Sequence, residues 1–418
     1  MSNSKFSINK MKMEVPLPIM LGGYGKREKP AISIHDDLYV NCFLVHSDSI
    51  NLAILSCDLL GIYDGNYEKI VEKIMEKVHL ENFKVLLSCV HSHSAPIINN
   101  NPKYSLNKDK LMNSLVNTSV NLINTSYDNL KEQKLSFTES YYNGVGKNRR
   151  SKDLEINTIL RTISLDKEKS VVVNYNCHPT LLSYKNNEVS KDYQGACLEY
   201  LCEAYGYKSM FLQGACGDVS TRFTRTSQSF EEVYRLGRLL GEQTFNQIKD
   251  TTFEAIENVT FNEYIFNLPM KEYHHENYYK EEIKKFSNLI NSNQNTNHGE
   301  LRLLETTLQG IKKEYLMSLN KNYEPLLIPC AILTLNNHAL VFLPFELFSK
   351  LDDEICKRSP YVSTYIIGYC FNCLGYLADK ESYKEGGYEV LSSIYANGAG
   401  EILVDKIISF LKNQKGEY

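Results

Sequence analysis

Apolar runs that stop abruptly at polar or ionisable residues recur along the chain. The clearest is KVLLSCVHSHSAP, residues 84–96, in which strand-forming residues give way to His91 and His93. A continuous apolar run of this length indicates a strand buried on both faces, and Pro96 prevents its simple continuation. Alternate residues of an extended segment point to the same side, so both histidines should face one site.

Four other predicted strands end in a similar way. The residues that follow them are Asp58 after 50–57, His178 after 171–175, the sequence GACGDVST with Ser220 after 209–213, and Glu346 after 340–343. Ligands of open α/β sheets bind outside the carboxyl ends of the strands, so these residues are candidates for one site. For Asp58 the alternative is that it caps the helix that follows.

Helical and strand patterns alternate, which predicts the fold class. Amphipathic patterns predict helices over 66–77, 110–130, 194–204 and 231–249, and a last helix from residue 399. Strand 50–57, helix 66–77 and strand 84–90 in succession favour parallel pairing, whereas 158–165 and 171–175 read as a hairpin. We therefore expect an α/β fold with mixed, largely parallel sheets covered by helices and a metal site at strand ends.

Residues 268–320 differ from the rest because they are long, charged and helical in pattern, with glycine only at Gly299 and Gly310. We expect a helical hairpin inserted on the α/β body and covering the site. His274 and His275 lie within it, but adjacent helical positions diverge by about 100°, which favours a solvated face over a metal site. No repeat or linker divides the chain, so we expect one catalytic domain over 1–418.

The composition limits the kinds of partner and the cellular location that we expect for the protein. The 418 residues carry 46 Lys and Arg against 50 Asp and Glu, with no long block of one sign, so we expect no nucleic-acid partner. No signal-peptide core and no apolar stretch of about 18 residues is present, which predicts no transmembrane segment and a cytoplasmic location. The 11 scattered cysteines favour reduced core thiols, and the C-x-x-C pair Cys370 and Cys373 lacks the second pair of a structural zinc site.

One basic segment, GVGKNRRS around Arg149, has two interpretations. Glycines around a basic cluster are typical of an anion-holding loop. A solvated charged turn is the alternative that the residue types alone favour.

Five motifs together resemble a known family. KVLLSCVHSHSAP, VNYNCHPTLLS, FLQGACGDVST, FLPFELF and GGYEV, in this order, are similar to the amino-terminal catalytic domain of the neutral/alkaline, non-lysosomal ceramidases, over about residues 22–403. The resemblance implies a zinc site held by His91, His178, Glu346 and Tyr388. It also implies the active-site residues His93, Arg149, Ser220 and Tyr376.

The chain departs from the pattern of that family at three points. We expect no export signal and no carboxy-terminal immunoglobulin-like domain, and Thr221 follows Ser220 where proline is usual. The resemblance therefore predicts the chemistry more firmly than the substrate, which we expect to be a ceramide-like or other small acyl amide.

The residue types suit that chemistry. Two imidazoles and a carboxylate fit Zn²⁺ and leave room for water, whose pKa the metal lowers towards about 7, so we expect metal-bound hydroxide to attack the amide. His93 and Tyr376 are donors for the oxyanion, and Arg149 would orient a polar or anionic group. Ser220 is either a nucleophile or a hydrogen-bonding group, and we favour the second because no histidine neighbours it in sequence.

Three alternatives remain open. The protein could be a zinc-dependent esterase or deacylase acting on a small non-lipid substrate. It could be a thiol hydrolase that uses Cys89 or Cys216, which predicts inactivation by alkylation and indifference to chelators. It could also bind zinc without turnover.

Overall fold

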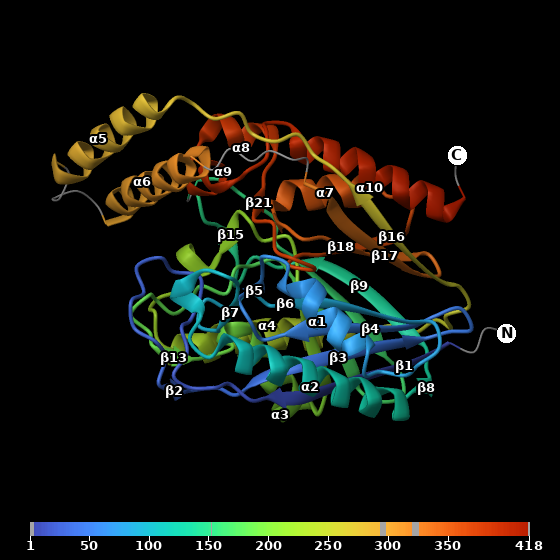
Figure 1. Cartoon of the computed structure of the whole chain (residues 1–418). Coiled ribbons are helices and arrows are strands. Elements are labelled where there is room, and N and C mark those ends of the chain that lie inside the picture. The colour runs from blue at the N-terminus through green and yellow to red at the C-terminus, as the bar shows by residue number, and fades with distance from the viewer. Residues whose placement is uncertain (1–3, 152, 293–297, 320–325, 417–418) are drawn as a thin grey trace.

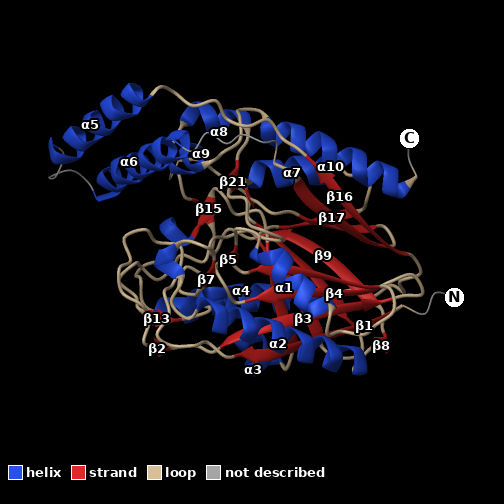
Figure 2. Ribbon diagram, viewed as in Figure 1, coloured by secondary structure: helices blue, strands red, loops and turns tan. Residues whose placement is uncertain are grey.

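The computed structural model describes residues 4–151, 153–292, 298–319 and 326–416. Its elements form two parts that lie one above the other (Figure 1). The amino-terminal part, blue to green, contains two sheets with helices on their outer faces. The carboxy-terminal part, yellow to red, contains a third sheet covered by helices, and strands of the two parts approach each other at their interface (Figure 2).

Three sheets contain the long strands. The first has the order β6-β4-β3-β1-β8, with bounds Phe83–Cys89, Asn51–Cys57, Leu38–His46, Lys5–Met13 and Lys131–Glu132. The second has the order β14-β12-β11-β9, with bounds Lys208–Gln213, Ser170–Tyr175, Ile159–Leu165 and Leu135–Tyr141. The third has the order β16-β17-β18-β20, with bounds Val259–Phe266, Ile328–Leu335, His338–Phe342 and Ser363–Ile367.

Each of these sheets combines one parallel pair with antiparallel neighbours. The parallel pairs are β4 with β6, β12 with β14 and β18 with β20, and the connecting segments contain α1 (Asn66–Met75), α3 (Asp192–Tyr205) and α7 (Ser349–Arg358). The predicted parallel pairing across the helix at 66–77 is thus confirmed. The expectation of largely parallel sheets is wrong, because short turns such as the one between β11 and β12 make most neighbours antiparallel.

The helices cover the sheets on faces that their sequences predict. α2 (Lys108–Asp128) packs on β1 and β3, while α3 and α4 (Phe230–Ile248) lie against the second sheet. α10 (Ala399–Lys415) lies beside α7 in the carboxy-terminal part. The amphipathic pattern of α1 predicts Ile70, Ile74 and Met75 on its buried face. Ile70 and Ile74 are fully buried, but Met75 is 37% exposed, because it lies at the end of the helix away from that apolar face.

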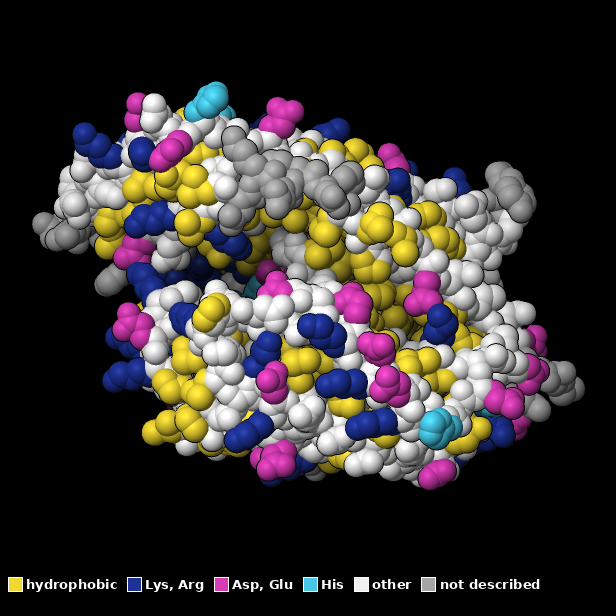
Figure 3. Space-filling model, in the orientation of Figure 1, with side chains coloured by type: hydrophobic (Ala, Val, Ile, Leu, Met, Phe, Trp, Pro, Cys, Tyr) yellow, Lys and Arg dark blue, Asp and Glu magenta, His cyan; other side chains and the backbone are white. Residues whose placement is uncertain are grey.

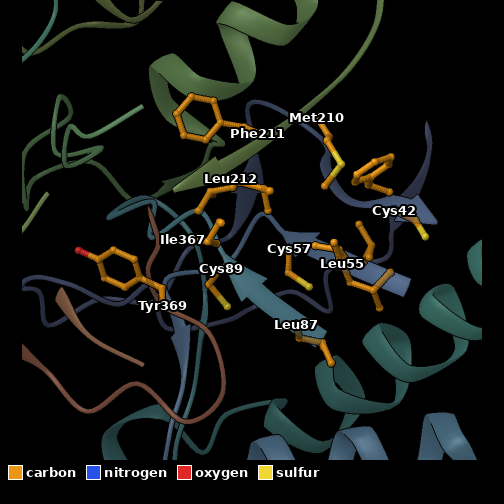
Figure 4. Packing of buried hydrophobic residues seen from close by; sticks show 14 of the residues in the cluster. Cys42, Leu55, Cys57, Leu87, Cys89, Met210, Phe211, Leu212, Ile367 and Tyr369 are labelled. Atoms are coloured by element: carbon orange, nitrogen blue, oxygen red, sulfur yellow. The ribbon is translucent and has the colours of Figure 1, made fainter. Parts of the chain in front are cut away.

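The core runs without a break between the sheets. Leu55 and Cys57 of β4 and Met210 and Leu212 of β14 belong to one buried cluster (Figure 4), and the hydroxyl of Ser56 on β4 donates to the carbonyl of Phe211 on β14 across the space between the first two sheets. On β17, alternate residues point to opposite sides: Ala331, Leu333 and Leu335 join this core, whereas Ile328, Cys330 and Ile332 pack towards α7 and α10. All 11 cysteines are unpaired, in agreement with the expectation of free thiols.

Short strand pairs and helices lie where the long strands end. The pairs are β5 (Gly61–Ile62) with β7 (Ile97–Ile98), β2 (Ser33–Ile34) with β13 (Glu188–Val189), β10 (Lys147–Asn148) with β15 (Val219–Ser220), and β19 (Glu346–Leu347) with β21 (Tyr376–Leu377). The short helices are α8 (Lys380–Glu385) and α9 (Tyr388–Ser392).

Two further helices occupy the stretch 268–320. α5 (Glu276–Ser292) and α6 (His298–Leu319) pack side by side above the amino-terminal part (Figure 1), and the residues between them lie outside the described ranges. α6 also packs on α9, where an added Cβ at Gly310 would lie 2.9 Å from Leu391 Cβ. Among the described residues, no helix has the length and apolar character that a membrane span requires.

Candidate active site

The carboxyl ends of three parallel strands converge at the interface of the two parts. His91 and His93 follow β6, His178 follows β12, and Glu346 follows β18 as the first residue of β19. One ring nitrogen from each of the three histidines lies within 4.8 Å of the others. The structure thus brings together four of the strand-end residues that the sequence singled out, and they follow strands of three different sheets.

The rings of His91 and His178 are oriented in the same way. The Nδ1–H of His91 donates to the carbonyl of Leu60, and that of His178 to the carbonyl of Cys216, each at 2.7 Å. A carbonyl only accepts, so Nδ1 carries the hydrogen in both rings and Nε2 faces inward. The two Nε2 atoms lie 3.6 Å and 3.1 Å from the same oxygen, Oε2 of Glu346. Metal-binding histidines are held in this manner.

The contact between His178 and Glu346 needs a positive charge. A carboxylate oxygen and an unprotonated Nε2 are both acceptors, so at 3.1 Å a proton or a cation must lie between them. Burial opposes the charge on Glu346, but His91 and His178 lower its pKa to about 2. Burial would also lower the pKa of His178, yet Cys216 and Glu346 raise it to about 9, whereas burial lowers the pKa of His91 to about 3. This set of donors fits a divalent cation that replaces the proton.

His93 lacks partners for its ring. Both of its ring nitrogens are buried and make no hydrogen bond with any described residue. Burial, together with His91 and His178, lowers its pKa well below the usual value, so the ring is neutral and carries one N–H. Gly23, at φ 84°, lies so close that an added Cβ would come within 2.3 Å of the ring, and Tyr24 packs edge-on against it at 4.9 Å between centroids. The ring is therefore held in place, and neither of its nitrogens has a partner among the described residues.

Arg149 connects two residues on the other side of the site. Its Nε donates to Glu389 at 2.6 Å and its Nη2 to the hydroxyl of Tyr376 at 2.9 Å. The hydroxyl of Tyr376 thus accepts a bond and keeps its own hydrogen free to donate. Burial raises the pKa of Tyr376 well above its usual value although Arg149 lowers it, so the hydroxyl remains protonated. Arg149 is only 8% exposed, and the interpretation of this segment as a solvated turn is wrong.

Ser220 and Tyr388 lie at the edges of this cluster. Ser220 neighbours His178 in a parallel bridge, and its hydroxyl accepts from the backbone N–H of Arg222 at 3.2 Å. No described histidine nitrogen is hydrogen-bonded to that hydroxyl. The ring of Tyr388 lies 6.1 Å from that of Tyr376, and no described contact joins it to Glu346. The role of Tyr388 as a metal ligand stays a prediction.

Two residues that the sequence did not single out belong to the same cluster. Tyr369, two residues after β20, packs on His91 with the rings tilted and 4.1 Å between centroids, and its hydroxyl lies 3.5 Å from His178 Nε2. It follows an apolar strand just as the histidines do, so the same signal would have found it. Glu389, the partner of Arg149, sits beside Tyr388 in GGYEV without a local signal of its own.

Other candidates lie outside the cluster. Asp58 accepts from the backbone N–H of Tyr39 at 2.9 Å and does not cap α1, which begins only at Asn66. Burial raises the pKa of Cys89 well above its usual value, which disfavours a thiolate there. The Sγ of Cys216 lies near the site, 3.1 Å from the hydroxyl of Tyr369, but is fully buried.

The comparisons with known proteins concern the fold. No family model matches the sequence, and the curated proteins contain no significant match. A solved structure of a ceramidase complexed with C2 matches 99% of this chain and 76% of its own, with a TM-score of 0.73 and 14% identity. The crystal structure of neutral ceramidase from Pseudomonas aeruginosa matches 98% of this chain and 75% of its own, with a TM-score of 0.71 and 14% identity. The chain therefore has a neutral ceramidase-like fold.

Proposed function

We propose that the protein is a zinc-dependent amidohydrolase that cleaves the amide bond of an N-acyl, lipid-like substrate. The observation that carries the proposal is the pair of inward-facing Nε2 atoms of His91 and His178, which share one carboxylate oxygen of Glu346. We take these three residues, with Tyr388, as the zinc ligands, and residues 1–418 as one catalytic domain. The neutral ceramidase-like fold supports the assignment of an amide substrate.

The chemistry divides between the metal and the residues around it. When bound, Zn²⁺ lowers the pKa of water towards about 7 and polarises a carbonyl. Hydrolysis of an amide also needs donors for the oxyanion that develops on the carbonyl oxygen. The neutral ring of His93 and the hydroxyl of Tyr376 supply them, since neither hydrogen is directed to a protein acceptor among the described residues. Arg149 positions Tyr376, and Glu389 holds Arg149.

Ser220 acts in this proposal by hydrogen bonding to the substrate or to water. Its hydroxyl already accepts the N–H of Arg222, and a serine nucleophile needs a base within hydrogen-bond reach. Such a base is absent among its described contacts. We therefore expect hydrolysis to proceed without an acyl-enzyme on Ser220.

The experiment compares zinc-free and zinc-reloaded protein on N-acyl amides and matched esters of graded chain length. We expect amide hydrolysis that disappears with a chelator, returns with zinc and survives treatment with iodoacetamide. Activity that resists chelation but is lost on alkylation would instead identify a thiol hydrolase, with Cys216 as the nearest thiol. Hydrolysis of esters alone would identify the esterase alternative, and tight zinc binding without any turnover would identify a binding protein.

A further inference from the structure

Three arginines beside the candidate site carry positive charge that few carboxylates of the protein neutralise. Arg222 and Arg225 belong to the segment that follows Ser220, and Arg302 belongs to α6. Arg222 and Arg225 form no ion pair with a carboxylate among the described residues, and Arg302 shares Glu305 with Lys26. Basic side chains gather around the hollow below α6 (Figure 3). The charge of this group, Arg222, Arg225 and Arg302, is thus left largely uncompensated by the protein.

The first two guanidinium groups are anchored by one bond each. Arg222 donates from Nη1 to the carbonyl of Arg149 at 2.7 Å, and Arg225 donates from Nη1 to the carbonyl of Thr180 at 2.6 Å. A guanidinium carries five N–H donors in a planar fork. The other donors of both groups have no acceptor among the described residues, so each arginine is fixed in position but keeps most of its binding capacity.

The arginines lie near enough to affect one another. Burial, together with Arg149, Arg302 and Arg225, lowers the pKa of Arg222 to about 10 against the effect of Glu389. Burial also lowers the pKa of Arg225, and Arg302 contributes in the same direction, whereas Tyr24 and Asp192 raise it. Half-buried like charges that no carboxylate pairs with directly cost stability. An anion bound among them would remove this cost.

The group adjoins the reacting residues. Arg222 is bonded to Arg149, whose guanidinium contacts Tyr376. On the other side of the site, Tyr24 packs on His93. Burial raises the pKa of the Tyr24 hydroxyl, and the nearby Arg225 and Arg302 both lower it. The nitrogens of His93 have no hydrogen-bond partner among the described residues, so a ligand can bind to this ring. An anion held by the arginines would therefore belong to the same ligand that reaches His93.

We infer that the substrate is an acyl amide that carries an anionic group, a carboxylate or a phosphate, bound by Arg222, Arg225 and Arg302. This inference rests on the proposed function and narrows its substrate class. Arginine forks bind both anions through paired, charge-assisted hydrogen bonds. α6 contributes to substrate choice through Arg302.

The test uses three amides with the same acyl chain on the zinc-loaded protein. N-octanoylglycine carries a carboxylate, the phosphate monoester of N-octanoylethanolamine carries a phosphate, and N-octanoylethanolamine is neutral. We expect kcat/KM to be higher for at least one anionic amide than for the neutral one. The preferred anion then identifies the group as carboxylate or phosphate.

Variants of the three arginines show which residues cause the preference for an anionic amide. Arg222→Gln and Arg225→Gln each remove charge-assisted hydrogen bonds to the anion, so each should lower the ratio of anionic to neutral kcat/KM about tenfold or more. Arg302→Gln should lower this ratio too. Arg302 lies on α6, away from the segment of Arg222 and Arg225, so this variant still tests the inference if the other two variants fail to fold. Arg358→Gln is the matched control, since Arg358 pairs with Asp405 on the far helices α7 and α10, and it should keep the ratio.

A ratio near one in the wild type, or one that all three variants leave unchanged, would overturn the inference. If no amide is cleaved, the proposed function fails but the inference can still be decided. In that case calorimetry measures binding of N-octanoylglycine and N-octanoylethanolamine to the same proteins. Equal binding of the charged and the neutral amide would then contradict the inferred anionic substrate.

Discussion

Arg161 and Asp352 form a fully buried, two-pronged ion pair, with Nη1 and Nη2 at 3.0 Å and 3.1 Å from the two carboxylate oxygens. Arg161 lies on β11 and Asp352 on α7, so the pair joins the two parts of the fold. Asn176, two residues before His178, also donates to Asp352 at 3.3 Å. The pair therefore helps to fix His178 against Glu346.

Asp352→Asn should destabilise the protein strongly. Removing one partner leaves the guanidinium of Arg161 buried without its main counterion, which typically costs about 3–5 kcal/mol of unfolding free energy. Asp405→Asn is the control, because the pair of Asp405 with Arg358 is exposed and contributes no more than about 1 kcal/mol. Urea unfolding measures both, and equal losses in the two variants would contradict the role of the buried pair.

Gly23→Ala should impair catalysis while leaving zinc bound. Gly23 has φ 84°, and a Cβ there would meet Nδ1 of His93 at 2.3 Å, so the ring must move. Loss of one oxyanion donor typically lowers the rate about 10²- to 10³-fold. Gly25→Ala is the matched control, since no atom lies within 4 Å of the Cβ position there. The kcat of Gly23→Ala should be lower than that of Gly25→Ala, whereas both variants should bind the same amount of zinc.

Asp218→Asn should remove part of the pH dependence of stability. Burial raises the pKa of Asp218 to about 6, although it accepts from the backbone N–H and the hydroxyl of Ser349. A raised pKa stabilises the fold below the unfolded value near 4, and this contribution is lost as the pH rises through 6. The variant should therefore gain up to about 3 kcal/mol relative to wild type between about pH 4.5 and about pH 7.5. A constant difference in urea unfolding across that range would show that Asp218 is not perturbed.

The strand-end pattern predicted much of the site, and the reason is physical. A buried strand needs a continuous apolar run, so His91 and His178 were visible as the points where such runs stop. The distribution of strands over three sheets was not predictable, because pairing partners such as β12 and β14 are specified by packing between distant segments. Arg149 looked solvated for the same reason, since its partners Tyr376 and Glu389 lie more than 200 residues away.

Ser220→Ala distinguishes hydrogen bonding from nucleophilic attack. If Ser220 only hydrogen-bonds, the variant should lose about 1–3 kcal/mol of transition-state stabilisation, and no acyl-enzyme should form in the wild type. If it is the nucleophile, activity should be abolished and amine should be released in a burst ahead of acid when deacylation is slower. Mass spectrometry of protein quenched during turnover provides the decisive observation. An acyl group on Ser220 would refute the hydrogen-bonding role.

The most direct measurement of the central claim is the zinc content of purified variants. We expect about one Zn²⁺ per chain in the wild type, because two imidazoles and a carboxylate converge at one point. His178→Ala and Glu346→Gln should lose the metal and the amidase activity together. His79→Ala, which changes an exposed histidine after α1, should keep both. Full zinc occupancy in His178→Ala, or a wild-type protein that binds no zinc, would show that these residues do not form a zinc site.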